Sequence, residues 1–267
     1  QSGGARMSLF TIDVARSPLG RINPVAKLAA TLVVSVTLLL SIDPVSAGVS
    51  LAATLVLLPF ARLPWRQVWL RVWPIALAAV IASLATVLYG RVSGEVFWQW
   101  GLVRISEGSI DLSLAILLRV LAIAVPSVLL FATTDPTDLA DGLAQVLRLP
   151  ARFVLGGLAG LRLVGLMVDD WRELGQARRA RGVADSGRVR RFAGQAFALF
   201  VLAIRRGTKL ATAMEARGFG APGARTWARP SLLRPRDGVL VLIAAVVAAA
   251  SVIAALAAGA WTFIFTL

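Results

Sequence analysis

The sequence contains no cysteine and no histidine, and this absence excludes several classes of chemistry. Without cysteine there is no disulfide, no thiolate metal site and no cysteine nucleophile. Without histidine there is no imidazole base and no histidine ligand for zinc or haem. The sequence also lacks a Gly-x-x-x-x-Gly-Lys-Ser/Thr stretch, which would bind nucleotide phosphates. We therefore expect a protein that is not an enzyme and that holds no metal and no cofactor of its own.

Acidic residues are also few, because the 267 residues include 14 Asp and Glu against 28 Lys and Arg, a net charge of +14. The same chain is 58% hydrophobic and has a mean hydropathy of +0.78. A soluble basic protein would be less apolar, whereas apolar membrane spans with basic flanks account for both properties. The composition therefore predicts an all-α integral membrane protein that crosses a membrane several times.

Five apolar runs approach or exceed the roughly 20 residues that a helix needs to cross a bilayer. They cover residues 24–42, 45–60, 72–89, 112–132 and 238–265. This spacing predicts three parts. They are an N-terminal membrane part over residues 1–132 with four spans, a cytoplasmic region over 133–237 and a C-terminal transmembrane helix over 238–267.

The basic residues predict how these spans are oriented. Of the 28, 25 lie in the N-terminal segment, in the link 62–71 or in the stretch 133–237. Because Lys and Arg concentrate on the cytoplasmic side of membrane proteins, we expect the N-terminus in the cytoplasm and the C-terminus outside. The same rule explains most of the net charge. A membrane-anchored binder of nucleic acid or anionic lipid is therefore a weaker interpretation, and we expect no nucleic-acid partner.

The stretch 133–237 is predicted to form three cytoplasmic helices. The first begins at Asp135, whose carboxylate can cap it, and ends at Leu149-Pro150. The other two cover residues 151–181 and 189–217. Each of these two carries an apolar part, 153–168 or 192–204, that is short and interrupted by glycine or charge. This pattern favours amphipathic helices against the membrane face, and seven spans is the alternative topology.

Both of the longer cytoplasmic helices are predicted to end in the same tripeptide, Ala-Arg-Gly. The two copies lie 36 residues apart and place Gly182 and Gly218 just after the helices. Glycine in the left-handed conformation commonly closes a helix, and arginine near a helix C-terminus is favoured by the helix dipole. Arg181 and Arg217 would then project two guanidinium groups toward carboxylates on a partner. An ordinary C-cap is the alternative interpretation of either copy alone.

This pattern resembles the transmembrane T component of energy-coupling factor transporters. The resemblance extends over essentially the whole chain and includes Ser17-Pro18-Leu19, the stretch 133–139, Leu149-Pro150 and both Ala-Arg-Gly ends. It implies a scaffold that links two cytoplasmic ABC-type ATPases, or a fused pair, to a membrane S component that binds a vitamin or metal ion. ATP and Mg²⁺ would be bound by those ATPases. A conventional ABC permease with its own substrate path is the alternative function.

The resemblance also implies roles for particular residues. The residues that would dock on the ATPases are Ala180, Arg181, Gly182, Ala216, Arg217 and Gly218. An apolar platform for the S component would consist of Leu139, Leu143, Leu147, Leu155, Leu158, Phe197, Leu199 and Phe200. For each residue of this platform, packing among the cytoplasmic helices is the alternative interpretation.

One ionisable residue, Arg119, falls well inside a predicted span. A charge inside a membrane is costly and usually pairs with another group or extends to the interface. Asp111 or a group on another helix is a possible partner, and a snorkelling side chain is the alternative. We expect a structural pairing.

Overall fold

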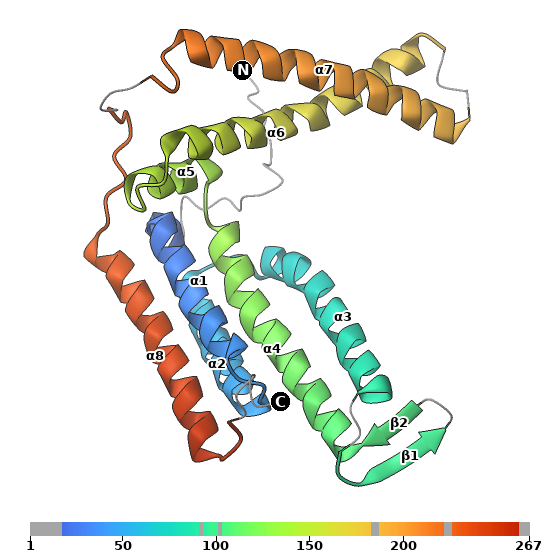
Figure 1. Ribbon diagram of the computed structural model, residues 1–267, viewed down its shortest axis with the longest axis vertical. Helices are drawn as coiled ribbons and strands as arrows, with labels where there is room; N and C mark the ends of the chain where they lie inside the picture. Colours follow the sequence, from blue (N-terminus) through green and yellow to red (C-terminus); the bar gives the residue numbers. More distant parts are fainter. Residues whose placement is uncertain (1–17, 91–92, 101–102, 183–186, 222–225, 262–267) are drawn as a thin grey trace. The chain divides into compact units, whose positions relative to one another are not determined.

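The computed structural model describes residues 18–90, 93–100, 103–182, 187–221 and 226–261. The chain forms two compact units, one of residues 1–139 with 231–267 and one of residues 140–230. Figure 1 labels the helices and strands along the chain.

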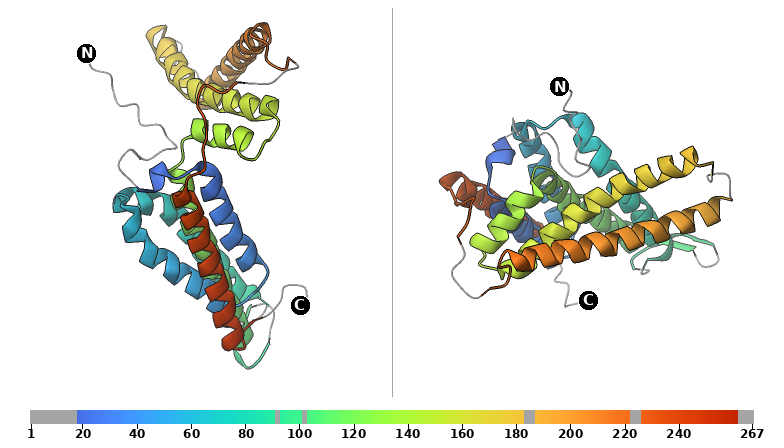
Figure 2. Two further views of the ribbon diagram at one scale, coloured as in Figure 1. Left: turned by 90° about the vertical axis from the view of Figure 1, so that its left-hand side faces the viewer. Right: turned by 90° about the horizontal axis from the view of Figure 1, so that it is seen from above.

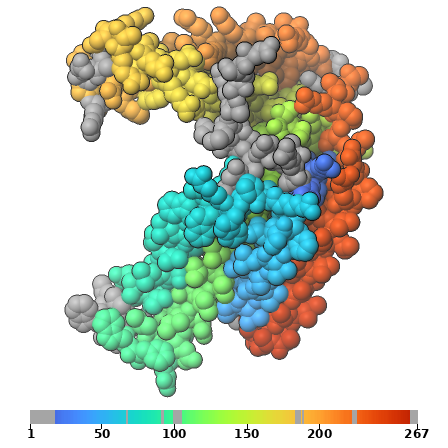
Figure 3. All heavy atoms as spheres, turned by 180° about the vertical axis from the view of Figure 1, so that it is seen from behind, coloured from blue at the N-terminus to red at the C-terminus, as the bar shows by residue number. Residues whose placement is uncertain are grey.

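The first unit is a bundle of five long helices (Figure 1). They are α1 (Pro24–Leu39), α2 (Pro44–Leu57), α3 (Trp65–Tyr89), α4 (Glu107–Ala132) and α8 (Pro235–Ala257). Two short 3₁₀ turns, η1 (Pro18–Arg21) and η2 (Leu58–Ala61), precede α1 and follow α2. Helix α4 packs against α1, α2 and α3, whereas α8 packs against α1 and α2. Figure 3 shows the face on which α2 and α8 lie side by side.

The core of this unit is rich in alanine, which lets the helix backbones approach closely. Its buried members are Ala30, Val34, Leu38, Ala122, Leu130 and Ala244. Large apolar side chains such as Leu32 and Leu242 instead point outward and are 65% and 63% exposed. Apolar groups outside and small groups between the helices suit a bundle surrounded by lipid.

Polar caps set where three of these helices begin. Asn23, Asp43 and Ser106 each have an extended backbone, and each side chain accepts a hydrogen bond from a backbone N–H in the first turn. A proline follows both Asn23 and Asp43, and its fixed φ suits the first helical position. Asp43 is 2% exposed and also accepts hydrogen bonds from the hydroxyls of Ser41 and Ser46. The tight turn predicted between the first two apolar runs is therefore fixed by a buried carboxylate.

Five described helices are long and apolar enough to cross a membrane, as predicted in number, but the set differs from the prediction. It comprises α2 with η2, α3, α4, α8 and the helix α6 (Ala151–Ala180). Helix α1 has 16 residues and falls below this length, because its apolar run stops before the Asp43 cap. Helix α6 is long and apolar enough because it has 30 residues and its first half is apolar, although none of that apolar stretch is buried among the described residues. Length and composition alone do not distinguish a helix that crosses a membrane from one that faces it.

The segment between α3 and α4 contains a β-hairpin that the sequence did not predict. Strands β1 (Val96–Trp100) and β2 (Val103–Ser106) pair antiparallel, with an irregularity at Phe97 between the pairs Val96↔Ser106 and Trp98↔Ile105. The bulge leaves the expected alternation of side chains imperfect, which hides the strands in the sequence. Trp98 and Phe97 are 54% and 63% exposed, so the hairpin presents aromatic groups to its surroundings.

The second unit contains most of α5 (Pro136–Gln145), which begins in the first unit, and all of two longer helices, α6 (Ala151–Ala180) and α7 (Arg188–Ala216). The predicted cap of α5 is confirmed, because Asp135 Oδ1 accepts a hydrogen bond of 2.7 Å from the N–H of Thr137. The predicted end at Leu149-Pro150 is wrong by about one turn. Arg148 has a left-handed φ of 53° and turns the chain after Gln145, before the proline is reached.

Candidate functional site

The end of α6 has the glycine cap that the sequence predicts. The helix ends at Ala180, and Arg181 occupies the C-cap position with φ −88° and ψ 3°. Gly182 takes a left-handed φ of 68°, and its N–H donates a 3.0 Å hydrogen bond to the carbonyl of Arg179. The side chain of Arg181 is exposed. It lies one position beyond the last helical residue rather than in the last turn.

The end of α7 repeats this geometry 36 residues later. Arg217 is the C-cap residue, and Gly218 has a left-handed φ of 79°. The N–H of Gly218 donates to the carbonyl of Glu215, and the N–H of Phe219 donates to that of Met214, both at 2.9 Å. This pair of bonds is the Schellman motif, which satisfies the last carbonyls of a helix. Arg217 is also exposed, so both copies present a guanidinium group at a closed helix end. We call residues 180–182 and 216–218 the two arginine tips.

The two arginine tips lie at opposite ends of the α6–α7 pair (Figure 1). The helices run antiparallel, since Trp171 and Arg178 of α6 contact the first half of α7. The tip of α6 is therefore near the beginning of α7, and the other tip is at the end of α7. At 1.5 Å per residue the length of α7 separates the tips by roughly 40 Å. Figure 2 shows the pair from two further directions.

Buried polar groups join α6 and α7 where the helices meet. The carboxylate of Asp170 is 7% exposed and forms an ion pair with Arg206 at 2.5 Å. Gln195, which is also buried, donates from Nε2 to the carbonyl of Trp171 at 2.5 Å. The Asp170–Arg206 contact is charge-assisted and therefore stronger than a neutral hydrogen bond such as that of Gln195. Together the two contacts fix the register of α6 and α7.

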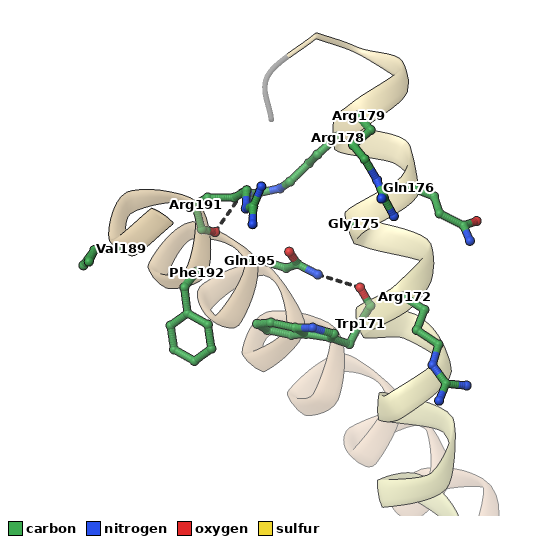
Figure 4. A pocket seen from close by; sticks show the side chains of 10 residues that line it. All are labelled: Trp171, Arg172, Gly175, Gln176, Arg178, Arg179, Val189, Arg191, Phe192 and Gln195. Carbon is green, nitrogen blue, oxygen red and sulfur yellow. Dashed lines mark hydrogen bonds between the residues drawn. The ribbon is translucent and has the colours of Figure 1, made fainter. Parts of the chain in front are cut away.

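Beside these contacts lies a hollow of about 730 Å³ (Figure 4). Arg178 reaches across it and donates from Nη2 to the carbonyl of Gly194 at 2.8 Å. The rings of Trp171 and Phe192 meet edge to face, with centroids 5.4 Å apart. Residues 170–178 of α6 thus contact α7 through backbone carbonyls and aromatic rings at residues 192–195 and through an ion pair further along, at Arg206. The sequence did not single out Asp170, Gln195 or Arg206, because a partner 36 residues away leaves no local pattern.

The predicted platform residues divide by exposure. Phe197, Phe200 and Leu147 are exposed, at 70%, 61% and 51%. The remaining members are half-buried, namely Leu139, Leu143, Leu155, Leu158 and Leu199. Four of the exposed apolar residues of α7 form a stripe with helical spacing, namely Phe197, Phe200, Val201 and Ile204, and Val189 and Phe192 are exposed nearer the beginning of the helix. The spacing i, i+3, i+4, i+7 would have identified Val201 and Ile204 from the sequence.

Helix α6 presents a second exposed apolar surface. Phe153 and Leu161 are 73% and 60% exposed and lie two turns apart on the helix. Between them Gly156, Gly157 and Gly160 have open space where a side chain would begin. These glycines therefore serve no close packing among the described residues, and they leave the α6 backbone accessible.

Arg119 lies in α4 and is half-buried. Its Nη2 atom is buried and has no hydrogen-bond partner among the described residues. The ion pairs found among the described residues do not include Arg119. Asp111 is exposed on α4 itself. The expected structural pairing of Arg119 therefore stays a prediction, and the buried carboxylate of Asp43, at the beginning of the neighbouring helix α2, is the candidate partner.

Among the described residues no group of three or more acidic side chains is placed to hold a metal ion. Comparison with known proteins then decides the family. A family model described as CbiQ, cobalt transport protein, matches residues 15–227 of the chain. The chain belongs to the CbiQ family. The match includes helices α1 to α7 and both arginine tips.

Curated relatives of this CbiQ-family protein carry one name, energy-coupling factor transporter transmembrane protein EcfT. The relative from Limosilactobacillus fermentum is 29% identical over 86% of this chain and 91% of its own length. Those from Streptococcus equi and Streptococcus thermophilus are 28% and 29% identical, over 85% and 86% of this chain and 88% and 91% of their own lengths. The predicted resemblance to the transmembrane component of these transporters is confirmed. This CbiQ-family protein is thus a multi-pass membrane component of a transporter.

Proposed function

We propose that the protein couples ATP hydrolysis by two cytoplasmic ATPases to the movement of a membrane S component that takes up a vitamin or metal ion. The observation that carries this proposal is the pair of arginine tips at opposite ends of one braced helix pair. The protein itself would bind neither ATP nor Mg²⁺ and would provide no catalytic residue. Its N-terminus and the second unit would lie in the cytoplasm, as the distribution of basic residues indicates.

The arginine tips have the chemistry of a docking element. Each arginine side chain is exposed at a helix end that a left-handed glycine closes. It could therefore enter a groove on a partner that is too narrow for a helix. Guanidinium groups bind carboxylates through two parallel hydrogen bonds, which fixes orientation as well as affinity. Since the tips lie roughly 40 Å apart along α7, we assign them to two ATPase subunits or to the two halves of a fused pair.

The contacts between α6 and α7 would transmit motion from one arginine tip to the other. The Asp170–Arg206 ion pair and the Gln195–Trp171 hydrogen bond hold α6 against α7, so displacement of one tip is resisted at the crossing. Interfaces packed in this way shift between discrete arrangements rather than deform smoothly. Closure of the ATPases would therefore change the angle or position of the whole pair.

The apolar surfaces of α6 and α7 are suited to the S component. Phe197, Phe200, Val201 and Ile204 form a continuous exposed stripe, and the exposed glycines of α6 allow a partner helix to approach its backbone. Small-residue helix faces are typical of contacts between membrane helices. The half-buried members of the predicted platform are divided between the units, since Leu139 lies in the first unit and Leu143, Leu155, Leu158 and Leu199 lie in the second.

Charge reversal at the tips tests the proposal. We expect the double variant Arg181→Glu/Arg217→Glu to lose co-purification with the ATPase subunits and to lose uptake, because it places acids where carboxylates should bind. The matched control is Arg172→Glu/Arg205→Glu, which changes the same charge at exposed arginines away from the tips. Normal assembly of the tip variant would contradict the proposal. Binding of the solute by the purified chain alone would instead favour a conventional permease.

A further inference from the structure

A groove of about 750 Å³ opens in the first unit, between helices that face lipid. Its walls come from α1, α2, α4 and α8 and are almost entirely apolar. The wall residues include Thr54, Leu129, Leu240, Ile243 and Val247. An apolar space of this size between membrane helices can hold an acyl chain.

Three arginines from separate elements line the same groove. Arg21 ends η1, Arg62 follows η2, and Arg236 lies in the first turn of α8. We call them the arginine rim. All three side chains are exposed. They lie far apart in the sequence, so only the fold brings them to one groove.

Among the residues that the structure describes, no acidic side chain lines the groove. The ion pairs identified among the described residues do not involve these three arginines. The nearest acid in sequence, Asp237, is 3% exposed, and its two carboxylate oxygens accept from the backbone N–H groups of Asn23 and Arg234. The rim is thus a concentration of positive charge that forms no ion pair with another described residue, at the mouth of an apolar groove.

We propose that this groove binds one anionic phospholipid, with the phosphate at the arginine rim and an acyl chain along α8. Guanidinium groups bind phosphate oxygens directly, and basic pockets between membrane helices suit anionic headgroups. The charge complementarity separates this occupant from an apolar helix of a partner, which would leave the three guanidinium groups unpaired. All three arginines lie in segments assigned to the cytoplasmic side, so the lipid belongs to the inner leaflet. The site does not depend on ATPase docking.

The test uses the full chain in phosphatidylcholine vesicles that contain a small fraction of spin-labelled phosphatidylglycerol. The variant Arg21→Gln/Arg236→Gln is expected to weaken the preference for phosphatidylglycerol over phosphatidylcholine by about fivefold for each arginine removed. Arg62 is kept, because its left-handed φ of 49° makes a substitution there affect the turn. The control Arg66→Gln/Arg71→Gln removes the same charge from α3, outside the groove.

A second variant tests the acyl chain separately from the headgroup. Val247→Trp fills the groove without changing charge, and we expect it to reduce the fraction of immobilised lipid of both kinds. A preference that survives in the rim variant, or that falls equally in the control, overturns the proposal. Loss of the immobilised lipid when the S component is added also overturns it, because the groove would then be a protein interface.

Discussion

Two buried charged residues stabilise the membrane unit from within its helix ends. Lys27 is 3% exposed, and its Nζ donates to the carbonyl and the hydroxyl of Thr133 at 2.7 and 3.2 Å. Asp43 is 2% exposed and caps α2 by accepting hydrogen bonds from the N–H and the hydroxyl of Ser46. Buried charges persist where hydrogen bonds replace water, so each of these residues ties one helix end to another.

Substitution of Lys27 by methionine should lower the stability of the unit. Methionine preserves most of the volume but leaves the Thr133 carbonyl at the end of α4 without its donor. We expect a loss of about 1–3 kcal/mol, the cost of a buried acceptor left unpaired. The measurement is the thermal unfolding midpoint in detergent, compared with Lys209→Met on the exposed surface of α7. An equal midpoint for both variants would contradict the role of Lys27.

A structural pairing of Arg119 with Asp43, the buried carboxylate at the beginning of the neighbouring helix α2, would produce non-additive effects. Asp43→Asn keeps a capping side chain but removes the charge that would compensate Arg119, so we expect destabilisation. The double variant Asp43→Asn/Arg119→Met should be more stable than Asp43→Asn alone, because no half-buried charge is left without a counter-charge. Unfolding midpoints of the four proteins in detergent measure this coupling. Additive effects would show that Arg119 acts independently of Asp43.

At the scale of whole elements, the ends of α6 and α7 depend on glycine. The left-handed φ values of 68° and 79° at Gly182 and Gly218 cost a residue with a side chain about 1–2 kcal/mol. Replacing a glycine by alanine inside α7 should instead stabilise the helix. Gly207 is helical, and a methyl group added there meets open space. Whether a glycine-to-alanine substitution stabilises or destabilises α7 therefore depends on its position in the helix.

Alanine at two glycines of α7 tests this contrast. Gly218→Ala should destabilise the end of α7 and move Arg217, whereas Gly207→Ala should stabilise the helix by about 0.5–1 kcal/mol. Hydrogen exchange of the backbone amides in α7 reports both changes. Faster exchange in the last turn is expected for the first variant and slower exchange across the helix for the second. Equal protection in the two variants would contradict the cap.

Loss of either member of the Asp170–Arg206 ion pair, which joins α6 to α7, should affect stability unequally. Asp170 is 7% exposed and Arg206 is 40% exposed. Arg206→Met therefore leaves a buried carboxylate without its counter-charge, whereas Asp170→Asn leaves an arginine that can reach water. We expect Arg206→Met to make the second unit more sensitive to proteolysis than Asp170→Asn does. The reverse order would show that the ion pair is not the main constraint at the crossing.

For the whole molecule, the sequence predicted what depends on local pattern. Apolar runs marked the helices, Asp135 marked the beginning of α5, and Gly182 and Gly218 marked the ends of α6 and α7. It did not predict contacts that join distant segments. The β-hairpin was hidden by a bulge, and the Asp170–Arg206 brace depends on how two helices pack.

The candidate site shows the same division. Both arginine tips follow from a tripeptide, but their placement at opposite ends of one pair requires the antiparallel contact of α6 with α7. The arginine rim gathers Arg21, Arg62 and Arg236 from three elements, and no spacing in the sequence connects them. Helical periodicity was sufficient to find the stripe of α7, although Val201 and Ile204 were not singled out.

The absence of cysteine provides the most direct test of the central claim, that each arginine tip meets its own ATPase. Ala180→Cys and Ala216→Cys each introduce the one thiol of the chain beside a tip while keeping its arginine. In membranes that contain the complete transporter, a thiol-reactive photo-cross-linker is expected to join each single variant to one ATPase and the double variant to two. Thr208→Cys, exposed about two turns before the end of α7, is the control that should give no such product with a short cross-linker. Cross-linking of the double variant to one ATPase only, or no product from either tip, would contradict the account.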